Sequence, residues 1–209
     1  MFNPIGRFFV IEGIDGSGKS TFARSLAEFI QAQGRPVLLT REPGATELGK
    51  VLRSLVQESK SSIDPYAELL LFTADRAQHM AQVVRPALGR GQIVITDRFK
   101  YSSLAYQGYG RDLDKSFIEC INDKVTRDVQ PDLVFYCKID PQIAIARCIN
   151  RNEKQTRFEA EGQLFMQKVS DGFDTIFENM PNVVTIDAHA SQEKMLSQAI
   201  AILQKRSLL

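Results

Sequence analysis

Short apolar runs alternate along the chain with longer stretches in which apolar residues recur every three or four positions. Runs rich in β-branched and aromatic residues are typical of strands, and the longer spacing is typical of amphipathic helices. The expected strands are residues 8–11, 37–40, 93–96, 133–139 and 183–186. The expected helices lie near residues 19–33, 46–58, 65–88, 114–126, 142–150, 160–178 and 191–205.

This alternation predicts an α/β fold, because parallel strands need crossover connections and these are usually helical. We expect three layers, with a five-stranded parallel sheet flanked by helices on both faces. Gly34 and Gly89 fall where expected helices end. A chain of 209 residues with 44% hydrophobic residues can bury a substantial core, so we expect a single domain over residues 1–209.

Charge and cysteine content narrow the function classes. The formal net charge of +1 gives no long-range field that would hold a nucleic-acid backbone. Cys120, Cys137 and Cys148 are an odd set without the spacing of a zinc site, which favours a reducing compartment. Glu12 interrupts the first apolar run before it could span a membrane. We therefore expect a cytoplasmic protein that binds neither nucleic acid nor membrane.

A phosphate-binding motif follows the first expected strand directly. Its sequence is Glu12-Gly13-Ile14-Asp15-Gly16-Ser17-Gly18-Lys19-Ser20-Thr21, which fits the pattern G-x-x-x-x-G-K-[ST]. The glycines permit a tight turn whose backbone N–H groups point inward, and the next helix presents its positive end to a phosphate. Lys19 can reach the β- and γ-phosphates, and the Ser20 hydroxyl can bind Mg²⁺. A dinucleotide-binding fingerprint is excluded because Thr21 occupies the position of its third glycine.

Charged residues follow two other expected strands, at the edge of a parallel sheet where ligands bind. Arg41 follows the second strand, and Asp97 and Arg98 follow the third. Asp97 is placed like the acidic residue that holds the Mg²⁺ water shell in phosphate-loop enzymes. Phe72 and Arg76 lie four apart on one helical face and suit a nucleobase, through stacking and edge contacts. Each residue alone is more typical of a core or surface position, so it is the combination that indicates a nucleotide site.

Together these segments resemble the thymidylate kinase family over residues 8 to about 187. The resemblance rests on the phosphate loop, Thr40-Arg41-Glu42-Pro43-Gly44, residues 71–79, Asp97-Arg98-Phe99 and residues 102–108. It implies a P-loop kinase fold and transfer of the γ-phosphate of ATP to dTMP, giving dTDP and ADP in dTTP biosynthesis. It also implies Mg²⁺ as the cofactor and a homodimer. The segment Phe99-Lys100-Tyr101 departs from the family's usual pattern.

The resemblance also assigns roles to individual residues. Phe72 would stack on thymine, Tyr106 would crowd the 2′ position of the sugar, and Asp15 would approach the 3′-hydroxyl. The implied catalytic residues are Lys19, Asp15, Arg98 and Arg157. The implied ATP-binding residues are Gly13, Ile14, Asp15, Gly16, Ser17, Gly18, Lys19, Ser20, Thr21, Arg147 and Arg151. The implied dTMP-binding residues are Asp15, Arg41, Phe72, Arg76, Arg98, Ser102, Ser103, Tyr106 and Gln107. Ser20 and Asp97 would hold Mg²⁺, partly through water.

A polar segment over residues 150–157 is typical of a mobile flap, and we expect a flexible lid at about residues 148–160. The phosphate loop itself carries no arginine. The resemblance therefore implies the bacterial-type arrangement, in which a lid arginine supplies that charge. The candidates are Arg147, Arg151 and Arg157, of which Arg157 is most similar to the family's flap arginine.

Three alternatives remain at this point. A sister kinase with another small acceptor would keep the phosphate loop but would not need Phe72, Arg76 and Tyr106 together. A GTP-binding switch protein would share the loop, but the chain has no Asn-Lys-x-Asp guanine signature. A non-enzymatic nucleotide-binding module would leave the acceptor-side arginines without a task.

Overall fold

Five parallel strands form one sheet in the order β2-β3-β1-β4-β5. Their bounds are β1 (Arg7–Glu12), β2 (Val37–Arg41), β3 (Ile93–Asp97), β4 (Leu133–Lys138) and β5 (Val183–Asp187). The computed structural model describes residues 6–58, 61–127, 129–151 and 156–208. All five strands lie where the sequence predicts them, and the predicted parallel α/β sheet is confirmed.

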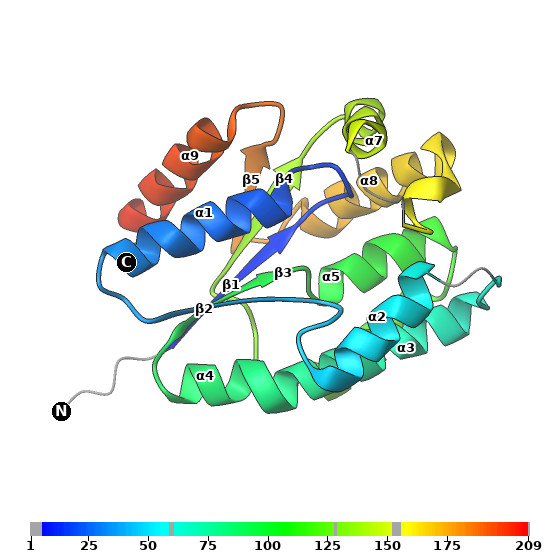
Figure 1. Ribbon diagram of the computed structural model, residues 1–209, viewed down its shortest axis with the longest axis horizontal. Coiled ribbons are helices and arrows are strands. Elements are labelled where there is room, and N and C mark those ends of the chain that lie inside the picture. The colour runs from blue at the N-terminus through cyan, green and yellow to red at the C-terminus, as the bar shows by residue number, and fades with distance from the viewer. Residues whose placement is uncertain (1–5, 59–60, 128, 152–155, 209) are drawn as a thin grey trace.

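Helices cover both faces of this sheet (Figure 1). On one face, α1 (Lys19–Ala32) packs against β1, β2 and β3 and against α9 (Gln192–Lys205). The opposite face carries α4 (Arg85–Gly89), which contacts β3. Further helices are α2 (Glu47–Glu58), α3 (Pro65–His79), α6 (Lys115–Thr126), α7 (Pro141–Asn150) and α8 (Gln163–Phe177). Among the described residues, no helix is both long and apolar enough to cross a membrane.

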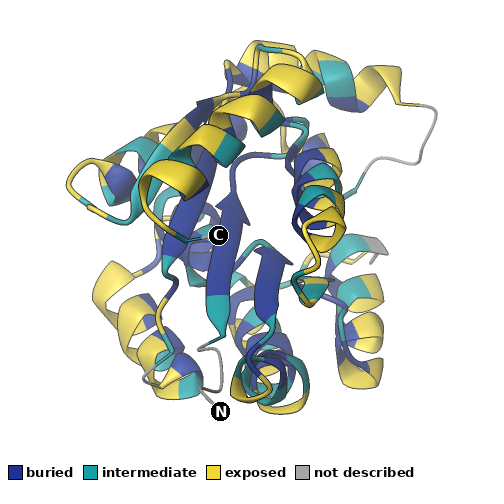
Figure 2. Cartoon of the chain, turned by 90° about the vertical axis from the view of Figure 1, so that its left-hand side faces the viewer, coloured by how far each residue is buried: buried dark blue, intermediate teal, exposed yellow. Residues whose placement is uncertain are grey.

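The core lies between the sheet and its helices, because the central strands are apolar on both faces. Phe9, Val10 and Ile11 of β1 are fully buried. Phe135 of β4 packs edge-on against Phe22 of α1, with ring centroids 5.7 Å apart. Figure 2 shows the strands buried between layers whose outer surfaces are exposed. This packing holds β1, and therefore the loop that follows it, in a fixed position.

The single helix expected at 65–88 is divided into three segments. A π-helical turn, η1 (Met80–Val84), separates α3 from α4. Pro86 lies in the first turn of α4 and has no backbone N–H to donate. The backbone N–H of Arg85 bonds to the carbonyl of Met80, five residues earlier, which is the pattern of a π-turn. The run therefore stays helical while it accommodates the proline.

A helical segment after β3 was not predicted. It consists of α5 (Lys100–Ser103) and the π-helical η2 (Leu104–Gly110). Its serines and glycines disfavour helix, so the sequence pattern gives no helical signal there. Tertiary packing provides the stabilisation: η2 lies along α8, and Tyr106 contacts the rings of Phe165 and Phe173. This segment carries the residues predicted to bind the acceptor nucleoside.

Candidate active site

A cavity of about 620 Å³ opens at the carboxyl edge of the sheet. The strand register aligns the ends of three strands at this edge, since Asp97 of β3 is paired with Ile11 of β1 and with Arg41 of β2. The predicted site residues that line the cavity are Asp15, Gly16, Gly18, Lys19, Ser20, Thr21, Arg41, Phe72, Arg76, Asp97, Arg98, Ser102, Ser103, Tyr106, Gln107, Arg147 and Arg151. Gly13, Ile14, Ser17 and Arg157 are not among its lining residues.

The phosphate loop connects β1 to α1 and depends on glycine at two positions. Gly16 has a φ of 83°, and a Cβ there would lie 2.2 Å from the carbonyl oxygen of Ala144. Gly18 caps α1 with a φ of 81° and provides no side chain to the helix N–H groups. The first backbone N–H groups of α1 are therefore left for an anion.

Lys19 is buried at the first position of α1. Its Nζ atom lies 3.3 Å from Asp15 Oδ1 and donates to the carbonyl oxygen of Ile14, also at 3.3 Å. A largely desolvated ammonium group exerts a strong local field, because the surrounding medium screens it poorly. The loop thus combines a charged lysine with free helix N–H groups in one small volume.

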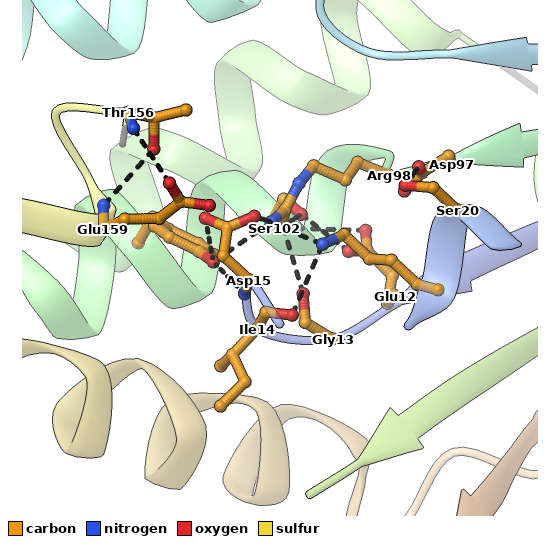
Figure 3. Close-up of polar contacts among 12 residues, drawn as sticks. Glu12, Gly13, Ile14, Asp15, Ser20, Asp97, Arg98, Ser102, Thr156 and Glu159 are labelled. Carbon is orange, nitrogen blue, oxygen red and sulfur yellow. Dashed lines mark hydrogen bonds and ion pairs between the residues drawn. The ribbon is translucent and has the colours of Figure 1, made fainter. Parts of the chain in front are cut away.

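Ser20 and Asp97 form the expected metal-binding pair. The Ser20 hydroxyl donates a hydrogen bond to Asp97 Oδ2, and Figure 3 shows the two side chains together. Asp97 Oδ1 is buried and has no hydrogen-bond partner among the described residues. A hydroxyl and a carboxylate with a spare oxygen fit Mg²⁺, which prefers oxygen ligands and keeps several waters. No group of three or more His, Cys, Asp or Glu in the described part of the chain could hold a metal ion. Bound Mg²⁺ would therefore depend on substrate phosphates and water as well.

Three side chains meet between the phosphate loop and η2. Arg98 Nη2 donates to Asp15 Oδ1 at 2.6 Å and to the Tyr106 hydroxyl at 3.1 Å. The Tyr106 hydroxyl donates to Asp15 Oδ2 at 3.2 Å. Burial raises the pKa of Asp15, but the positive charges of Arg98 and Lys19 lower it by more. The resulting pKa lies below the ordinary value of an aspartate. Asp15 is therefore an ionised acceptor at the centre of the cavity.

The backbone of Arg98 is held in an uncommon conformation by the strand end. Its φ is 74°, and its N–H donates to the carbonyl of Ile11 at 2.9 Å. Below it, buried Glu12 accepts hydrogen bonds from the backbone N–H groups of Phe99 and Ser102. Burial raises the pKa of Glu12 to about 7, although Arg98 opposes the shift. Glu12 thus fixes the turn that aims Arg98 into the cavity.

Arg76 lines the cavity, but its guanidinium is already bonded to protein groups. It donates to Glu42 Oε2 at 2.7 Å and to the Ser103 hydroxyl at 3.0 Å. Asn122 and the Phe99 carbonyl accept from it as well. The predicted contact of Arg76 with the base edge stays a prediction, and in this structure Arg76 fixes Ser103 and the loop after β2.

One wall of the cavity is aromatic. The Phe72 ring lies 5.8 Å from that of Phe158, which in turn lies 5.8 Å from the ring of Tyr106. The buried Gln107 also lines this wall. An aromatic wall beside polar amide and hydroxyl groups matches the two needs of a nucleobase, stacking and edge hydrogen bonds. None of Phe99, Lys100 and Tyr101, where the sequence departs from the family pattern, lines the cavity.

The structure separates the arginines expected near the lid. Arg147 lines the cavity and donates to the carbonyl of Ala188 at 2.9 Å. Arg151 also lines it and contacts Glu159. Arg157 does not line the cavity, and its Nη2 atom lies 3.0 Å from Glu68 Oε2. Residues 152–155 of the expected lid lie outside the described residues.

Several cavity residues were missed by the sequence analysis. Arg53 and Gln57 reach the cavity from α2, and Arg53 Nη1 donates to the Pro43 carbonyl at 2.9 Å. Burial lowers the pKa of Arg53, and the charges of Arg41 and Arg98 lower it further. An arginine on an amphipathic helix is most often solvent-exposed, and only the turn after β2 brings this one back to the sheet edge. Phe158 and Glu159 also line the cavity, and they were missed because they directly follow the polar segment over residues 150–157.

The chain is similar to known proteins over nearly its whole length. A family model described as thymidylate kinase matches residues 11–200. Thymidylate kinase of Synechococcus sp. (strain CC9902) is 44% identical over 202 residues, covering 93% of this chain and 95% of the relative. Thymidylate kinase of Gloeobacter violaceus is 43% identical over 193 residues, covering 91% of each. The crystal structure of thymidylate kinase from Ehrlichia chaffeensis is 33% identical, with a TM-score of 0.80, and covers 96% of this chain and 100% of that chain.

Proposed function

The chain belongs to the thymidylate kinase family, and on this premise we propose how its cavity performs the reaction. The reaction transfers the γ-phosphoryl group of ATP to dTMP and gives dTDP and ADP. The chain is accordingly an ATP-dependent nucleoside monophosphate kinase, which is a phosphotransferase. The observation that carries the mechanism is that the phosphate loop and the aromatic wall open into the same cavity.

On the donor side, the phosphate loop and the first turn of α1 bind the phosphates of ATP. Lys19 contacts the β- and γ-phosphates from its buried position. Arg147 and Arg151 approach the donor from the end of α7 and add positive charge around its phosphates. Ser20 and Asp97 would hold Mg²⁺, which would neutralise part of the negative charge of the phosphates.

On the acceptor side, Arg41, Arg53 and Arg98 surround the phosphate of dTMP. Phe72 stacks on the thymine ring. The edge of the thymine and the sugar are contacted by Ser102, Ser103 and Gln107. Tyr106 occupies the space beside the 2′ position, where a ribose would place a hydroxyl. Asp15 accepts a hydrogen bond from the 3′-hydroxyl, since its pKa is low and its carboxylate is ionised.

Transfer needs no acid–base pair, because the attacking oxygen of dTMP is already an ionised phosphate oxygen. The chain's contribution is to hold the two phosphates in line and to stabilise the charge between them. Lys19 and Arg98 are the cations placed for this, and both contact Asp15 Oδ1. The catalytic role implied for Arg157 stays a prediction, since its side chain does not line the cavity.

We propose that residues 148–160 act as a lid over the donor phosphates. Arg151, Phe158 and Glu159 of this segment line the cavity, and Glu159 Oε2 accepts from the backbone N–H of Thr156 at 2.8 Å. A lid that excludes water would protect ATP from hydrolysis.

A homodimer is proposed from a patch of exposed apolar side chains on three adjacent helices. We call it the helical patch, and its residues are Leu48, Val51 and Leu55 of α2, Tyr66 and Leu70 of α3 and Phe117 of α6. Helix α3 packs against both α2 and α6, and the rings of Tyr66 and Phe117 lie 6.2 Å apart. Contiguous exposed apolar residues of this kind are typical of protein interfaces.

We also propose that the enzyme works in the cytoplasm. Cys120, Cys137 and Cys148 are free thiols, which fits a reducing compartment. The substrates ATP and dTMP are small molecules, and no site for nucleic acid is proposed.

An acceptor panel tests the function. The release of ADP from ATP and Mg²⁺ would be measured with dTMP, dUMP, UMP, CMP, GMP or AMP, and without any acceptor. We expect dTMP to be strongly preferred and ADP release without acceptor to be slow. Preference for another nucleotide would assign the chain to a sister kinase, and equal ADP release in every reaction would rule out an acceptor site in this cavity.

A further inference from the structure

Glu68 is a fully buried carboxylate on α3 that the proposed reaction does not use. It lies one helical turn before Phe72 and two before Arg76, so the three side chains share one helix face. Burying a carboxylate is costly unless it is paired and hydrogen-bonded. Its partners therefore show what it holds in place.

The first group of partners comes from the acceptor side of the cavity. Gln107 Nε2 donates to Glu68 Oε1 at 2.9 Å. Arg111, which directly follows η2, donates to the same carboxylate from Nε and Nη2 at 3.4 and 3.3 Å. Glu68 thus fixes the end of the segment that carries Tyr106 and Gln107.

The second partner is Arg157, which belongs to the C-terminal part of the proposed lid. Arg157 Nη2 lies 3.0 Å from Glu68 Oε2 and 3.4 Å from the carbonyl of Ile63. The backbone N–H of Arg157 donates to the carbonyl of Gln57 at the end of α2. Both the side chain and the backbone of Arg157 are therefore bound to α2, to Ile63 and to α3.

Phe158 connects this anchor to the cavity. It is buried, follows Arg157 directly and places its ring between those of Phe72 and Tyr106. The position of this ring determines the space left beside the predicted thymine and sugar sites. A displacement of about 1 Å in a positioned group can cost up to about a hundredfold in rate or affinity.

We propose that Glu68 and Arg157 are positioning residues for dTMP. Their ion pair holds Phe158 and Gln107 in place, so that the C-terminal part of the proposed lid shapes the acceptor nucleoside pocket. This inference rests on the proposed function, and it assigns Arg157 a task different from contact with the γ-phosphate.

The test is dTMP binding in the absence of ATP, measured by calorimetry for Arg157→Met, Arg157→Lys, Glu68→Gln and the double variant Glu68→Gln/Arg157→Met. We expect the dTMP dissociation constant to rise about tenfold in Arg157→Met and in Glu68→Gln. Lysine keeps the charge and should restore most of the affinity. The double variant should bind dTMP about as weakly as either single variant, because both remove the same link. ADP binding should change by less than about twofold throughout.

Arg7→Met is the matched control, because Arg7 also pairs with a carboxylate, Asp132, but at the amino end of β1. It should leave dTMP binding unchanged. Unchanged dTMP binding in Arg157→Met together with a lower kcat would overturn the inference in favour of a direct donor role. Equal losses of dTMP and ADP binding would overturn it in favour of general disruption. Failure of the unaltered chain to bind dTMP would reject the proposed function itself.

Discussion

Tyr106 and Asp15 are joined by two hydrogen bonds across the cavity. The Tyr106 hydroxyl donates to Asp15 Oδ2 at 3.2 Å and accepts from the Asp15 backbone N–H, also at 3.2 Å. The residue expected beside the 2′ position and the residue expected beside the 3′-hydroxyl are thus fixed relative to each other. Sugar recognition and the phosphate loop are therefore one structural unit.

The first prediction concerns this sugar site. Tyr106→Ala should raise kcat/KM for UMP relative to dUMP, because these acceptors differ only in the 2′-hydroxyl. Tyr106→Phe should keep the discrimination, since the ring still fills the space among Phe158, Phe165 and Phe173. The alanine variant leaves a cavity that costs about 3–5 kcal/mol of stability, so assays should run well below its melting temperature. An unchanged ratio in the alanine variant would remove Tyr106 from the sugar site.

The second prediction concerns the phosphate loop. Lys19→Ala should lower kcat by about a hundredfold or more while the fold persists, because the loop then lacks its only buried cation. Steady-state ADP release measures the loss, and circular dichroism with thermal melting checks the fold. Lys50→Ala, which removes an exposed lysine on α2, is the control and should retain normal activity. Near-normal turnover in Lys19→Ala would contradict the assignment of the loop.

The sequence predicted what local patterns determine. The strands were predictable because buried parallel strands are continuous apolar runs, and the phosphate loop because glycine and lysine occur at fixed spacing. Ser20 and Asp97 were predicted together, and the structure brings them into contact.

What the sequence did not reveal depends on long-range packing. The bond of Arg76 to Glu42, for example, spans 34 positions along the chain. The direction of Arg157 depends on Glu68, a charged residue that most often would be exposed. Segment 100–110 is helical only because α8 covers it, and no periodicity in its own residues indicates that.

A third prediction concerns base stacking. Phe72→Ala should raise KM for dTMP about ten- to a hundredfold, because stacking of a base on an aromatic ring is worth about 1–3 kcal/mol. KM for ATP should stay within about twofold, since Phe72 lies on α3, outside the phosphate loop and α7 that are proposed to bind the donor. The ATP value serves as the internal control. Parallel increases in both KM values would show that Phe72 supports the whole cavity and does not bind the base.

The fourth prediction tests the helical patch. Val51→Lys places a charge at the centre of the exposed apolar face of α2, where Val51 is 57% exposed. Sedimentation should show a dimer for the unaltered chain and a monomer for this variant, because burying an unpaired charge in an interface is unfavourable. Leu164→Lys changes an even more exposed leucine on α8, away from the patch, and should remain dimeric. A monomeric unaltered chain would reject the dimer.

The last prediction follows from Glu12 and stability. Burial raises the pKa of Glu12 to about 7 from 4.5, with opposing contributions from Arg98, Ser102, the Phe99 N–H and Arg76. Between these two values the folded chain holds a proton that the unfolded chain has lost. Stability therefore falls as pH rises through this window, by about 3 kcal/mol for a shift of this size. Asp75, whose pKa burial and Glu42 raise to about 6, acts in the same direction.

Glu12→Gln isolates the contribution of Glu12, because an amide can still accept from the Phe99 and Ser102 N–H groups and does not titrate. Urea unfolding from about pH 5 to about pH 8 should show a shallower loss of stability in Glu12→Gln than in the unaltered chain. Asp75→Asn should also make the slope shallower, because the pKa of Asp75 is raised as well. If all three stability curves ran parallel, Glu12 would contribute nothing to the pH dependence. It would then be ionised at every pH tested, and it would accept its hydrogen bonds from the Arg98 turn as a carboxylate.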